Sequence, residues 1–405
     1  MKILLATSRA IPTGGGIASY NQELLCALGN NNRLFLLTES NEVNVQGFEQ
    51  TISSYGHSIF RYQYNKYIID KINKERFDII INSNSKQLSI VAPFVNAPII
   101  TVAHYFRGIM ADESGYNSKY LSKIIVLSKS CKEYLFNKFK ISKEKIDIIY
   151  NFVSDNNSSF NKNKLNNDPL EIIYPGGASI GKSSDVVVEA VYKLLSTKLN
   201  FKLYWLGDTL TFASRLSIHG LKRIEDFFQE DKRLIFTGKV NRKEAETLIG
   251  DSNVFILPSR GEGCPMTLLE AMRGGCIPII SDSNHGSLDI IHDSNAGIIT
   301  KQDNSEDLYS AITDILTNHS KYYDYYFKTY KYSKEVLSRD KWIMQMQNVF
   351  SKAIMKEKTT EVLNRYKFYR SLIPFRWLII KHHFKKNIQI VKYRIKVECL
   401  YKRFH

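Results

Sequence analysis

Residues 253–275, NVFILPSRGEGCPMTLLEAMRGG, decide the fold of this chain. They open with a short continuous apolar run, which is typical of a strand covered on both faces of a sheet. A loop with glycines follows, and Pro265 stands where a first-turn proline would start a helix. Glu262 in the loop and Glu270 in the helix place two carboxylates around that helix start. The stretch therefore predicts a strand, a loop and a helix whose N-terminus is flanked by acids.

The start of this helix is a candidate site for a diphosphate. N–H groups of a first helical turn lack partners within the helix, and the helix dipole adds positive character there. We expect the amides of Met266, Thr267 and Leu268 to hold the anion. Glu270 could then accept hydrogen bonds from ribose hydroxyls, and Glu262 could face a sugar ring. The simpler alternative makes Glu262 a solvated loop residue and Glu270 a surface charge that complements the dipole.

Apolar runs of the same kind recur on both sides of this stretch, with helical patterns between them. Their continuous apolar character predicts parallel strands with helices on both faces. A chain of 405 residues is long enough for more than one core, so we expect an α/β protein with two doubly wound, Rossmann-like lobes. The predicted strands are KILLAT (2–7), RLFLLT (33–38), FDIII (77–81), PIITV (98–102), KIIVL (123–127), IDIIY (146–150), EIIY (171–174), FKLYWLG (201–207), RLIFTG (233–238), NVFILP (253–258), CIPII (276–280) and AGIIT (296–300).

These two series of strands set the expected domain organisation. Residues 1–155 form the first lobe, 156–169 are a linker rich in Asn, Ser and Lys, and 170–335 form the second lobe. A helix over 336–356 is expected to return to the first lobe, and residues 357–405 form a basic, aromatic tail. Ligands of such lobes bind outside the carboxyl ends of the strands, so a central cleft between two facing lobes is the expected active site.

A second glycine-rich loop follows the first predicted strand. Gly14, Gly15 and Gly16 precede a helical pattern, so the backbone there could approach an anion closely. The run is not G-x-G-x-x-G, and no well-placed acid closes the next strand for a ribose, which argues against a dinucleotide dehydrogenase. The alternative is a flexible turn, because strand–glycine–helix joins occur in most α/β folds.

Together these segments resemble a known enzyme family. The pattern P-S-x-x-E-G-x-P-x-x-L-L-E-A-M-x-x-G over 258–274 resembles the nucleotide-sugar motif of retaining glycosyltransferases of family 4 (glycosyl transferases group 1), which have the GT-B fold. Residues 14–16 are similar to the family's glycine loop, and His104 to its cleft histidine. The resemblance covers residues 1–355 and assigns the donor to the second lobe and the acceptor to the first.

The resemblance implies transfer of a sugar from a nucleoside diphosphate sugar to an acceptor hydroxyl, with retention of configuration. Lys182 and the amides at 266–268 would stabilise the charge that develops on the departing diphosphate. His104 would bind the donor sugar, although a lone histidine is also often structural. The chain has no D-x-D sequence, so we expect neither a metal ion nor another cofactor, and no residue stands out as a covalent nucleophile.

One position departs from the family pattern. The second lobe of the family opens with Gly-Arg and a nearby Lys, two cations that grip the diphosphate. Here Lys182 matches, but Gly177 stands where the arginine is expected. Arg260 is the candidate that could partly replace it. If Arg260 does not replace it, the affinity for the donor is lower, or the protein is a degenerate member of the family. For Lys182 itself, the simpler interpretation is an exposed loop lysine without a role in binding.

Charge is concentrated at the C-terminal end of the chain. Residues 352–405 carry 15 Lys and Arg against 3 Glu, a net +12 of the chain's +16. Because cations alternate with aromatic and aliphatic residues there, we expect the tail to lie on an anionic membrane surface. A basic helix packed on its own domain, a solubilising face or nucleic-acid contact are the alternatives. The nearly balanced body argues against a nucleic-acid protein.

The five cysteines show no metal-ligand spacing, which fits buried thiols in a reducing compartment, and no apolar run is long enough to span a membrane. The sequence therefore predicts a cytoplasmic glycosyltransferase, peripheral on the inner face of the membrane. Its acceptor would be a glycan or lipid-linked glycan in cell-surface polysaccharide or glycolipid synthesis. The alternatives are a non-catalytic nucleotide-sugar-binding protein of this fold, a nucleotide-sugar epimerase or a polyanion-binding α/β protein. The sequence leaves the donor base, sugar, acceptor and linkage open.

Overall fold

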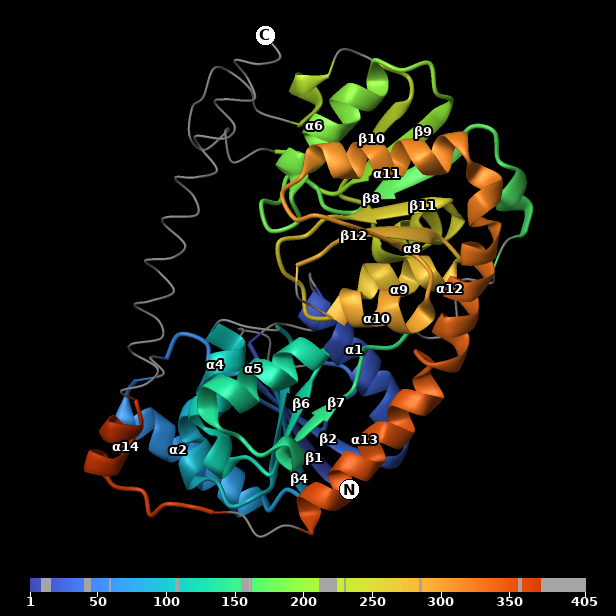
Figure 1. The fold of residues 1–405 in the computed structure, drawn as a ribbon. Helices are drawn as coiled ribbons and strands as arrows, with labels where there is room; N and C mark the ends of the chain where they lie inside the picture. Colours follow the sequence, from blue (N-terminus) through green and yellow to red (C-terminus); the bar gives the residue numbers. More distant parts are fainter. Residues whose placement is uncertain are drawn as a thin grey trace. The chain divides into compact units, whose positions relative to one another are not determined.

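The computed structural model of this chain describes residues 1–8, 16–39, 45–57, 60–105, 109–153, 160, 162–210, 224–228, 231–283, 286–355 and 359–372. Within these ranges the chain forms two compact units (Figure 1). Unit 1 contains residues from 1–151 together with 339–372, and unit 2 contains residues from 152–338. Each unit is built around one parallel sheet.

Unit 1 has a seven-stranded sheet in the order β3-β2-β1-β4-β5-β6-β7. All its strand pairs are parallel. Apolar residues of β1, β4 and β5 are almost completely buried, as expected of strands covered on both faces. Its strands are β1 (Lys2–Thr7), β2 (Arg33–Thr38), β3 (Gln50–Ser53), β4 (Ile79–Ser83), β5 (Ile99–Ala103), β6 (Lys123–Val126) and β7 (Ile146–Ile148).

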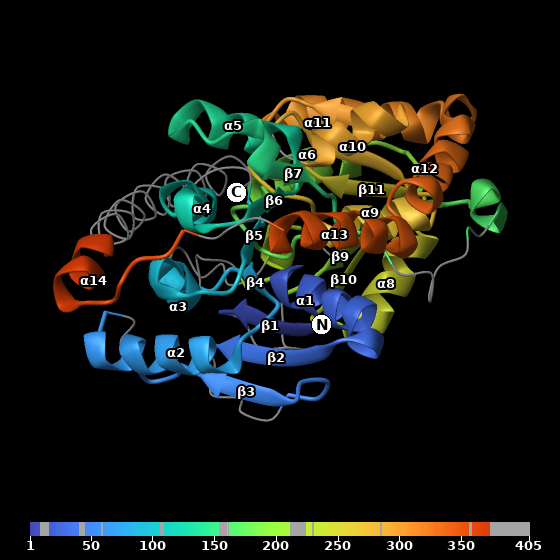
Figure 2. The ribbon, with the colours of Figure 1, turned by 90° about the horizontal axis from the view of Figure 1, so that it is seen from below.

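Helices cover both faces of this sheet (Figure 2). On one side lie α1 (Gly16–Leu28) and α13 (Arg339–Ile354), where the rings of Tyr20 and Trp342 meet edge to face at 6.2 Å. The remaining helices of the unit are α2 (Tyr62–Glu75), α3 (Lys86–Val91), α4 (Ile109–Tyr116), α5 (Lys129–Phe139) and α14 (Arg365–Ser371). Phe368 on α14 and the following Leu372 are buried in the unit's hydrophobic core, so the start of the predicted tail packs on unit 1.

Unit 2 has a six-stranded parallel sheet in the order β10-β9-β8-β11-β12-β13. Its strands are β8 (Leu170–Tyr174), β9 (Phe201–Leu206), β10 (Leu234–Gly238), β11 (Val254–Leu257), β12 (Ile277–Ser281) and β13 (Ile298–Thr300). Its helices are α6 (Ser184–Leu195), α8 (Arg242–Asp251), α9 (Met266–Arg273), α10 (Gly286–Ser294), α11 (Ser305–Thr317) and α12 (Tyr323–Glu335). Helix α6 packs with α11, while α9 packs with α8 and α12.

The structure confirms the predicted fold class of two doubly wound, Rossmann-like parallel sheets. Each of the twelve predicted strands coincides with an observed strand to within three residues at either end, and β3 is the strand that the sequence analysis missed. The predicted linker is in part folded onto unit 2. There Lys164 is buried, and its Nζ donates to the carbonyls of Gly250 at 3.0 Å and Ser252 at 2.9 Å.

The cysteines agree only partly with expectation. Cys131, Cys264 and Cys276 are buried free thiols, but Cys26 is exposed. No helix in the described ranges is long and apolar enough to cross a membrane.

Candidate functional site

The candidate site of unit 2 lies where the strand order reverses. In that sheet β8 has β9 on one side and β11 on the other, so the loops after β8 and β11 leave the sheet side by side. Such a reversal opens a crevice at the carboxyl ends of the strands, where ligands of doubly wound sheets bind. Lys182 follows β8, whereas Arg260 and Glu262 follow β11. The topology therefore brings together residues that lie about 80 positions apart in the sequence.

The loop after β8 explains why no arginine stands at position 177. Gly177 has φ of +51°, in the left-handed region, and a Cβ placed there would lie 2.6 Å from the carbonyl oxygen of Asp208. The loop is also held from the neighbouring strand, because Trp205 Nε1 donates to the Gly177 carbonyl at 3.1 Å. A side chain at this position would displace backbone, so the glycine is a packing requirement of this loop.

Lys182 is held at the end of this loop. Its carbonyl accepts a hydrogen bond from Tyr174 Oη at 3.0 Å, and its N–H donates to the Ser179 carbonyl at 3.2 Å. Its Nζ lies 3.8 Å from Glu262 Oε1. Both side chains are partly exposed, Lys182 by 30% and Glu262 by 20%, so a ligand can reach the pair. Ser259 Oγ also donates to Glu262 Oε1, at 3.4 Å.

Arg260 has surroundings that differ from those the sequence analysis assumed. Its guanidinium forms a bidentate ion pair with Asp185 and a further ion pair with Asp303. Burial lowers the pKa of Arg260, but the two carboxylates raise it more, so the net shift is upward and the group stays charged. Its charge is therefore already neutralised. The interpretation of Arg260 as a replacement cation for the diphosphate is not supported, because its charge is balanced by these two aspartates.

Helix α9 follows the same loop, with one correction. It begins at Met266, one residue later than predicted, so Pro265 is the N-cap with extended backbone and not a residue of the first turn. The N–H of Leu268 donates to the Pro265 carbonyl at 3.1 Å, so one of the three amides expected to face an anion already has an acceptor. The Thr267 hydroxyl is buried with no hydrogen-bond partner among the described residues. Two backbone amides and this hydroxyl remain as anion donors of the first turn.

Glu270 lies one turn further along α9 and is half-buried. The start of α10 is tied to the same loop, because the Gly286 N–H donates to the Gly263 carbonyl at 2.6 Å. Two serines behind the loop, Ser281 and Ser283, donate to the Ser259 carbonyl. The loop that carries Glu262 is thus fixed to β12 and α10 as well as to the loop after β8.

The remaining predicted residues belong to unit 1. Gly15 lies outside the described residues, and Gly16 is the first residue of α1, where a Cβ would meet nothing within 4 Å. His104 directly follows β5 and is buried, with its Nε2 2.9 Å from Ser83 Oγ and its ring edge-on to Tyr20 at 4.8 Å. Burial lowers the pKa of His104 to about 4, so the ring is neutral at pH 7. A buried, neutral and hydrogen-bonded ring is also typical of a structural histidine, so binding of the donor sugar by His104 stays a prediction.

Glu113 on α4 is a buried acid that the sequence analysis missed. The residue is 7% exposed, and its carboxyl has no hydrogen bond or ion pair with a described residue. Burial raises its pKa to about 7, opposed by the charge of Lys86 and reinforced by that of Glu39. No sequence signal marked it, since a single glutamate in a helical segment is commonly a solvated charge.

The raised pKa of Glu113 predicts a specific pH dependence of stability. Between pH 4.5 and about 7 the folded protein keeps a proton that the unfolded chain loses, so stability falls as the pH rises through this window. The expected loss is on the order of 3 kcal/mol. Glu113→Gln removes this dependence. The lowered pKa of His104 also makes stability depend on pH, but equally in both proteins, so it cancels in the difference between them. Urea unfolding of both proteins at about pH 5 and about pH 8 measures the difference; parallel pH profiles would contradict the assignment.

Comparisons with known proteins agree with this architecture. Residues 155–333 match the model of the family described as glycosyl transferases group 1. The O-antigen biosynthesis glycosyltransferase WclY of Escherichia coli is 27% identical over 238 residues, which are 53% of this chain and 63% of WclY. An uncharacterized 41.2 kDa protein in the cps region of Klebsiella pneumoniae is 23% identical over 279 residues, 62% of this chain and 72% of that protein. The structure of Anabaena HepE in complex with UDP covers 87% of this chain and all of HepE, with a TM-score of 0.70 and 14% identity.

Two parallel Rossmann-like sheets give the chain the GT-B fold, and the match to the family model and the relatives named as glycosyltransferases indicate its activity. The chain is therefore a transferase of class EC 2.4, as the resemblance implied. More particularly, the part of the chain that matches the model of glycosyl transferases group 1 is unit 2, over residues 155–333.

Proposed function

We propose that this protein is a retaining glycosyltransferase of family 4. It transfers a sugar from a nucleoside diphosphate sugar to an acceptor hydroxyl in the synthesis of a cell-surface polysaccharide or glycolipid. The observation that carries the proposal is the pairing of Lys182 with Glu262 where the strand order of unit 2 reverses, beside the first turn of α9. A cation, anion donors and a carboxylate at the carboxyl ends of two neighbouring strands, β8 and β11, are groups suited to binding a diphosphate sugar.

Each of these groups has a distinct part in the proposed chemistry. The barrier of glycosyl transfer lies in the departure of the diphosphate from an oxocarbenium-like sugar. Lys182 and the amides of Met266 and Thr267 would stabilise the negative charge that develops on the leaving group. Glu262, close to Lys182, would accept hydrogen bonds from sugar hydroxyls, and Glu270 from the ribose. Each of these residues acts on the donor, which unit 2 would hold by itself.

The relatives support the two finer parts of this proposal. HepE, which shares the fold, was crystallised with UDP, which fits a nucleoside diphosphate donor here. WclY is named for O-antigen biosynthesis, which fits an acceptor in cell-surface glycan synthesis. Retention of configuration and independence of metal rest on the resemblance of residues 258–274 to the motif of family 4 and on the lack of a D-x-D sequence.

A binding screen tests the proposal directly. Purified protein is titrated with UDP-, GDP-, ADP- and TDP-sugars, with ligand-observed NMR as the readout and EDTA present in a parallel series. We expect one nucleotide to bind and the chelator to leave its affinity unchanged. Binding of none of the four would contradict a nucleotide-sugar enzyme, and loss of binding in EDTA would contradict independence of metal.

Two rival functions are distinguished by following turnover of the donor that the screen identifies, with and without an added acceptor. A non-catalytic nucleotide-sugar-binding protein, which the missing arginine at Gly177 favours, would bind the donor without turnover for any acceptor. An epimerase would isomerise the nucleotide sugar without an added acceptor. The transferase is expected to release the nucleoside diphosphate in proportion to the acceptor that is glycosylated.

We also propose that the protein acts at the cytoplasmic face of a membrane, held there by residues 357–405. The described part of this segment supports a surface role. Tyr366 and Tyr369 on α14 are 73% and 48% exposed, and Arg365, Lys367 and Arg370 lie on the same helix. Tyrosines and cations together are typical of segments at a membrane interface. The remainder of the predicted segment lies outside the described residues.

Removal of the tail is expected to abolish binding to anionic vesicles. A chain that ends after Leu372 keeps Phe368 and Leu372 in the core of unit 1, whereas truncation after Lys356 would remove both buried side chains. Each Lys or Arg contributes about 1 kcal/mol near an anionic leaflet, so the full chain should sediment with phosphatidylglycerol vesicles at low salt. Neutral phosphatidylcholine vesicles are the control. Equal sedimentation of both proteins would contradict the proposal.

A further inference from the structure

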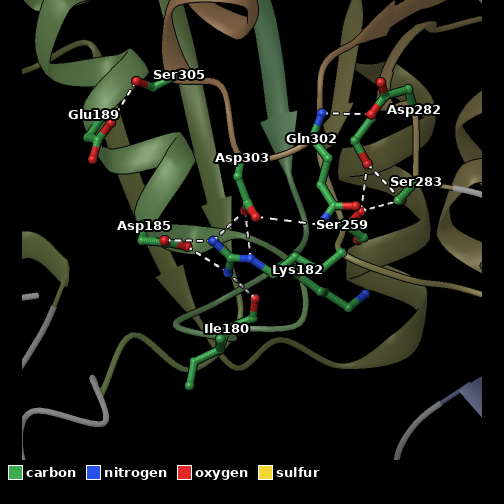
Figure 3. A network of polar contacts seen from close by, with 12 residues as sticks. Ile180, Lys182, Asp185, Glu189, Ser259, Asp282, Ser283, Gln302, Asp303 and Ser305 are labelled. Atoms are coloured by element: carbon green, nitrogen blue, oxygen red, sulfur yellow. Dashed lines mark hydrogen bonds and ion pairs between the residues drawn. The ribbon is translucent and has the colours of Figure 1, made fainter. Parts of the chain in front are cut away.

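Arg260 donates hydrogen bonds to Ile180, Asp185 and Asp303, three residues of the polar network in unit 2 that Figure 3 shows. Its Nη1 donates to the Ile180 carbonyl at 2.6 Å and to Asp185 Oδ1 at 2.9 Å. Its Nη2 donates to Asp185 Oδ2 at 2.7 Å, and its Nε donates to Asp303 Oδ1 at 2.7 Å. Four hydrogen bonds thus hold the guanidinium in one orientation, with Asp185 accepting from both Nη atoms and Asp303 from Nε.

These acceptors belong to two segments at the carboxyl ends of the strands, one after β8 and one after β13. Ile180 lies in the loop after β8 and Asp185 in the first turn of α6, whereas Asp303 follows β13. A backbone hydrogen bond also joins the loops after β8 and β11, because the Arg260 N–H donates to the Gly181 carbonyl at 2.8 Å. Arg260 therefore fastens the loop that carries Lys182 to the loop that carries Glu262.

The ion pair between Arg260 and Asp185 is a strong constraint. The Asp185 side chain is 1% exposed and the Arg260 side chain 23% exposed, and their contact is bidentate. Removal of one partner from such a buried pair leaves an uncompensated charge and is costly. The aspartates also occupy the guanidinium, so that Lys182 is left to meet an anion.

The geometry points to Arg260 as a positioning residue that, together with Asp185, fixes Lys182 beside Glu262 for the donor diphosphate and does not bind the diphosphate itself. The inference rests on the proposed function. A lysine is a flexible point charge, so its effect on a phosphate depends on where its backbone is held. Here the Lys182 carbonyl is held by Tyr174, and the two preceding carbonyls are held by Arg260. The pair preorganises the cation before the donor binds.

Substitutions of both partners separate positioning from direct binding. The probe is inorganic pyrophosphate, the group common to all candidate donors, and its Kd is measured by ligand-observed NMR. We expect Arg260→Ala and Asp185→Asn each to weaken binding about 10- to 100-fold, as small displacements of a binding group do. Arg260→Lys should not restore binding, because an ammonium cannot form the bidentate pair. If Arg260 bound the anion directly, Asp185→Asn would leave binding intact or tighten it, and Arg260→Lys would keep it.

A double-mutant cycle with Lys182→Ala tests whether Arg260 acts through Lys182. The quantity measured is the effect of Arg260→Ala on the Kd for pyrophosphate, with and without the Lys182 side chain. If Arg260 acts through Lys182, Arg260→Ala should change the Kd by less than about threefold once Lys182 is absent. Losses that multiply would overturn the inference. If Arg260→Ala does not fold, Arg260→Lys completes the cycle, because it keeps the positive charge but cannot form the bidentate pair with Asp185.

Arg233 offers a matched control. It precedes β10 at the opposite end of the sheet, is 25% exposed, and pairs with Asp231 while donating to the carbonyls of Thr197 and Leu195. Arg233→Ala should lower Tm as Arg260→Ala does but leave the Kd for pyrophosphate unchanged. An equal effect of both substitutions on Kd would overturn the inference. If wild-type protein binds neither pyrophosphate nor any nucleotide sugar, the proposed function fails, and this inference fails with it.

Discussion

Replacement of Lys182 by alanine is expected to lower kcat/KM for the donor by about 10³-fold, which is the scale of losing one group that stabilises developing charge. Position 177 is a glycine and supplies no cation, and Arg260 is paired with Asp185 and Asp303. Lys182 is therefore expected to provide more of the stabilisation of the diphosphate charge than the lysine of a two-cation site would. Steady-state kinetics with the donor that the screen identifies will measure the effect. The loss should appear in kcat, because the charge on the leaving group develops in the transition state.

Lys193→Ala is the matched control for this experiment. Lys193 lies in the last turn of α6, is similarly exposed, and pairs with a glutamate, Glu306, away from the reversal of strand order. Its replacement should leave kcat/KM unchanged. If Lys182→Ala retains wild-type kinetics, Lys182 is a surface lysine and the assignment of the leaving-group site to this loop is wrong.

Replacement of Glu270 by alanine is expected to weaken nucleotide binding by about 100-fold, since a hydrogen bond to a charged group contributes about 1.5–3 kcal/mol. The carboxylate lies one turn beyond the anion donors of α9, which is where the ribose of a bound nucleotide would follow its diphosphate. The measurement is calorimetry with the nucleotide and with its 2′-deoxy analogue. Wild-type protein should prefer the ribonucleotide, and the variant should not distinguish the two.

Glu246→Ala on α8 controls for the loss of a carboxylate in the same unit, because Glu246 pairs with Arg242 on the surface. Its nucleotide affinity should match wild type. Unchanged affinity of Glu270→Ala would show that Glu270 only complements the dipole of α9, the simpler interpretation that the sequence allowed.

The fold was largely predictable because buried parallel strands leave continuous apolar runs in the sequence. Strand β3 was missed since QTIS is short and half polar, as an edge strand can be. The candidate site was predictable where one motif contained it, as with Glu262 and Glu270. Lys182 was found by its place after the first strand of the second lobe, as in the family pattern.

Partners across the fold were not predictable. Arg260 looked like a free cation because nothing near it in the sequence is acidic except Glu262, and Asp185 lies 75 positions away. The raised pKa of Glu113 could not be predicted for a related reason, because it depends on burial by residues from other elements. Sequence patterns identify which groups a site contains more readily than they identify which of those groups are already paired.

Unit 1 is assembled from both ends of the chain, and this has a consequence for its synthesis. Trp342 and Phe350 of α13 and Phe368 of α14 are buried in a unit whose sheet is complete by residue 148. On the ribosome, the first sheet must wait for these side chains, while the intervening residues that form unit 2 are all available by residue 338. Domains fold as units during translation. We therefore expect unit 2 to complete its fold during translation before unit 1, although most of unit 1 is synthesised first.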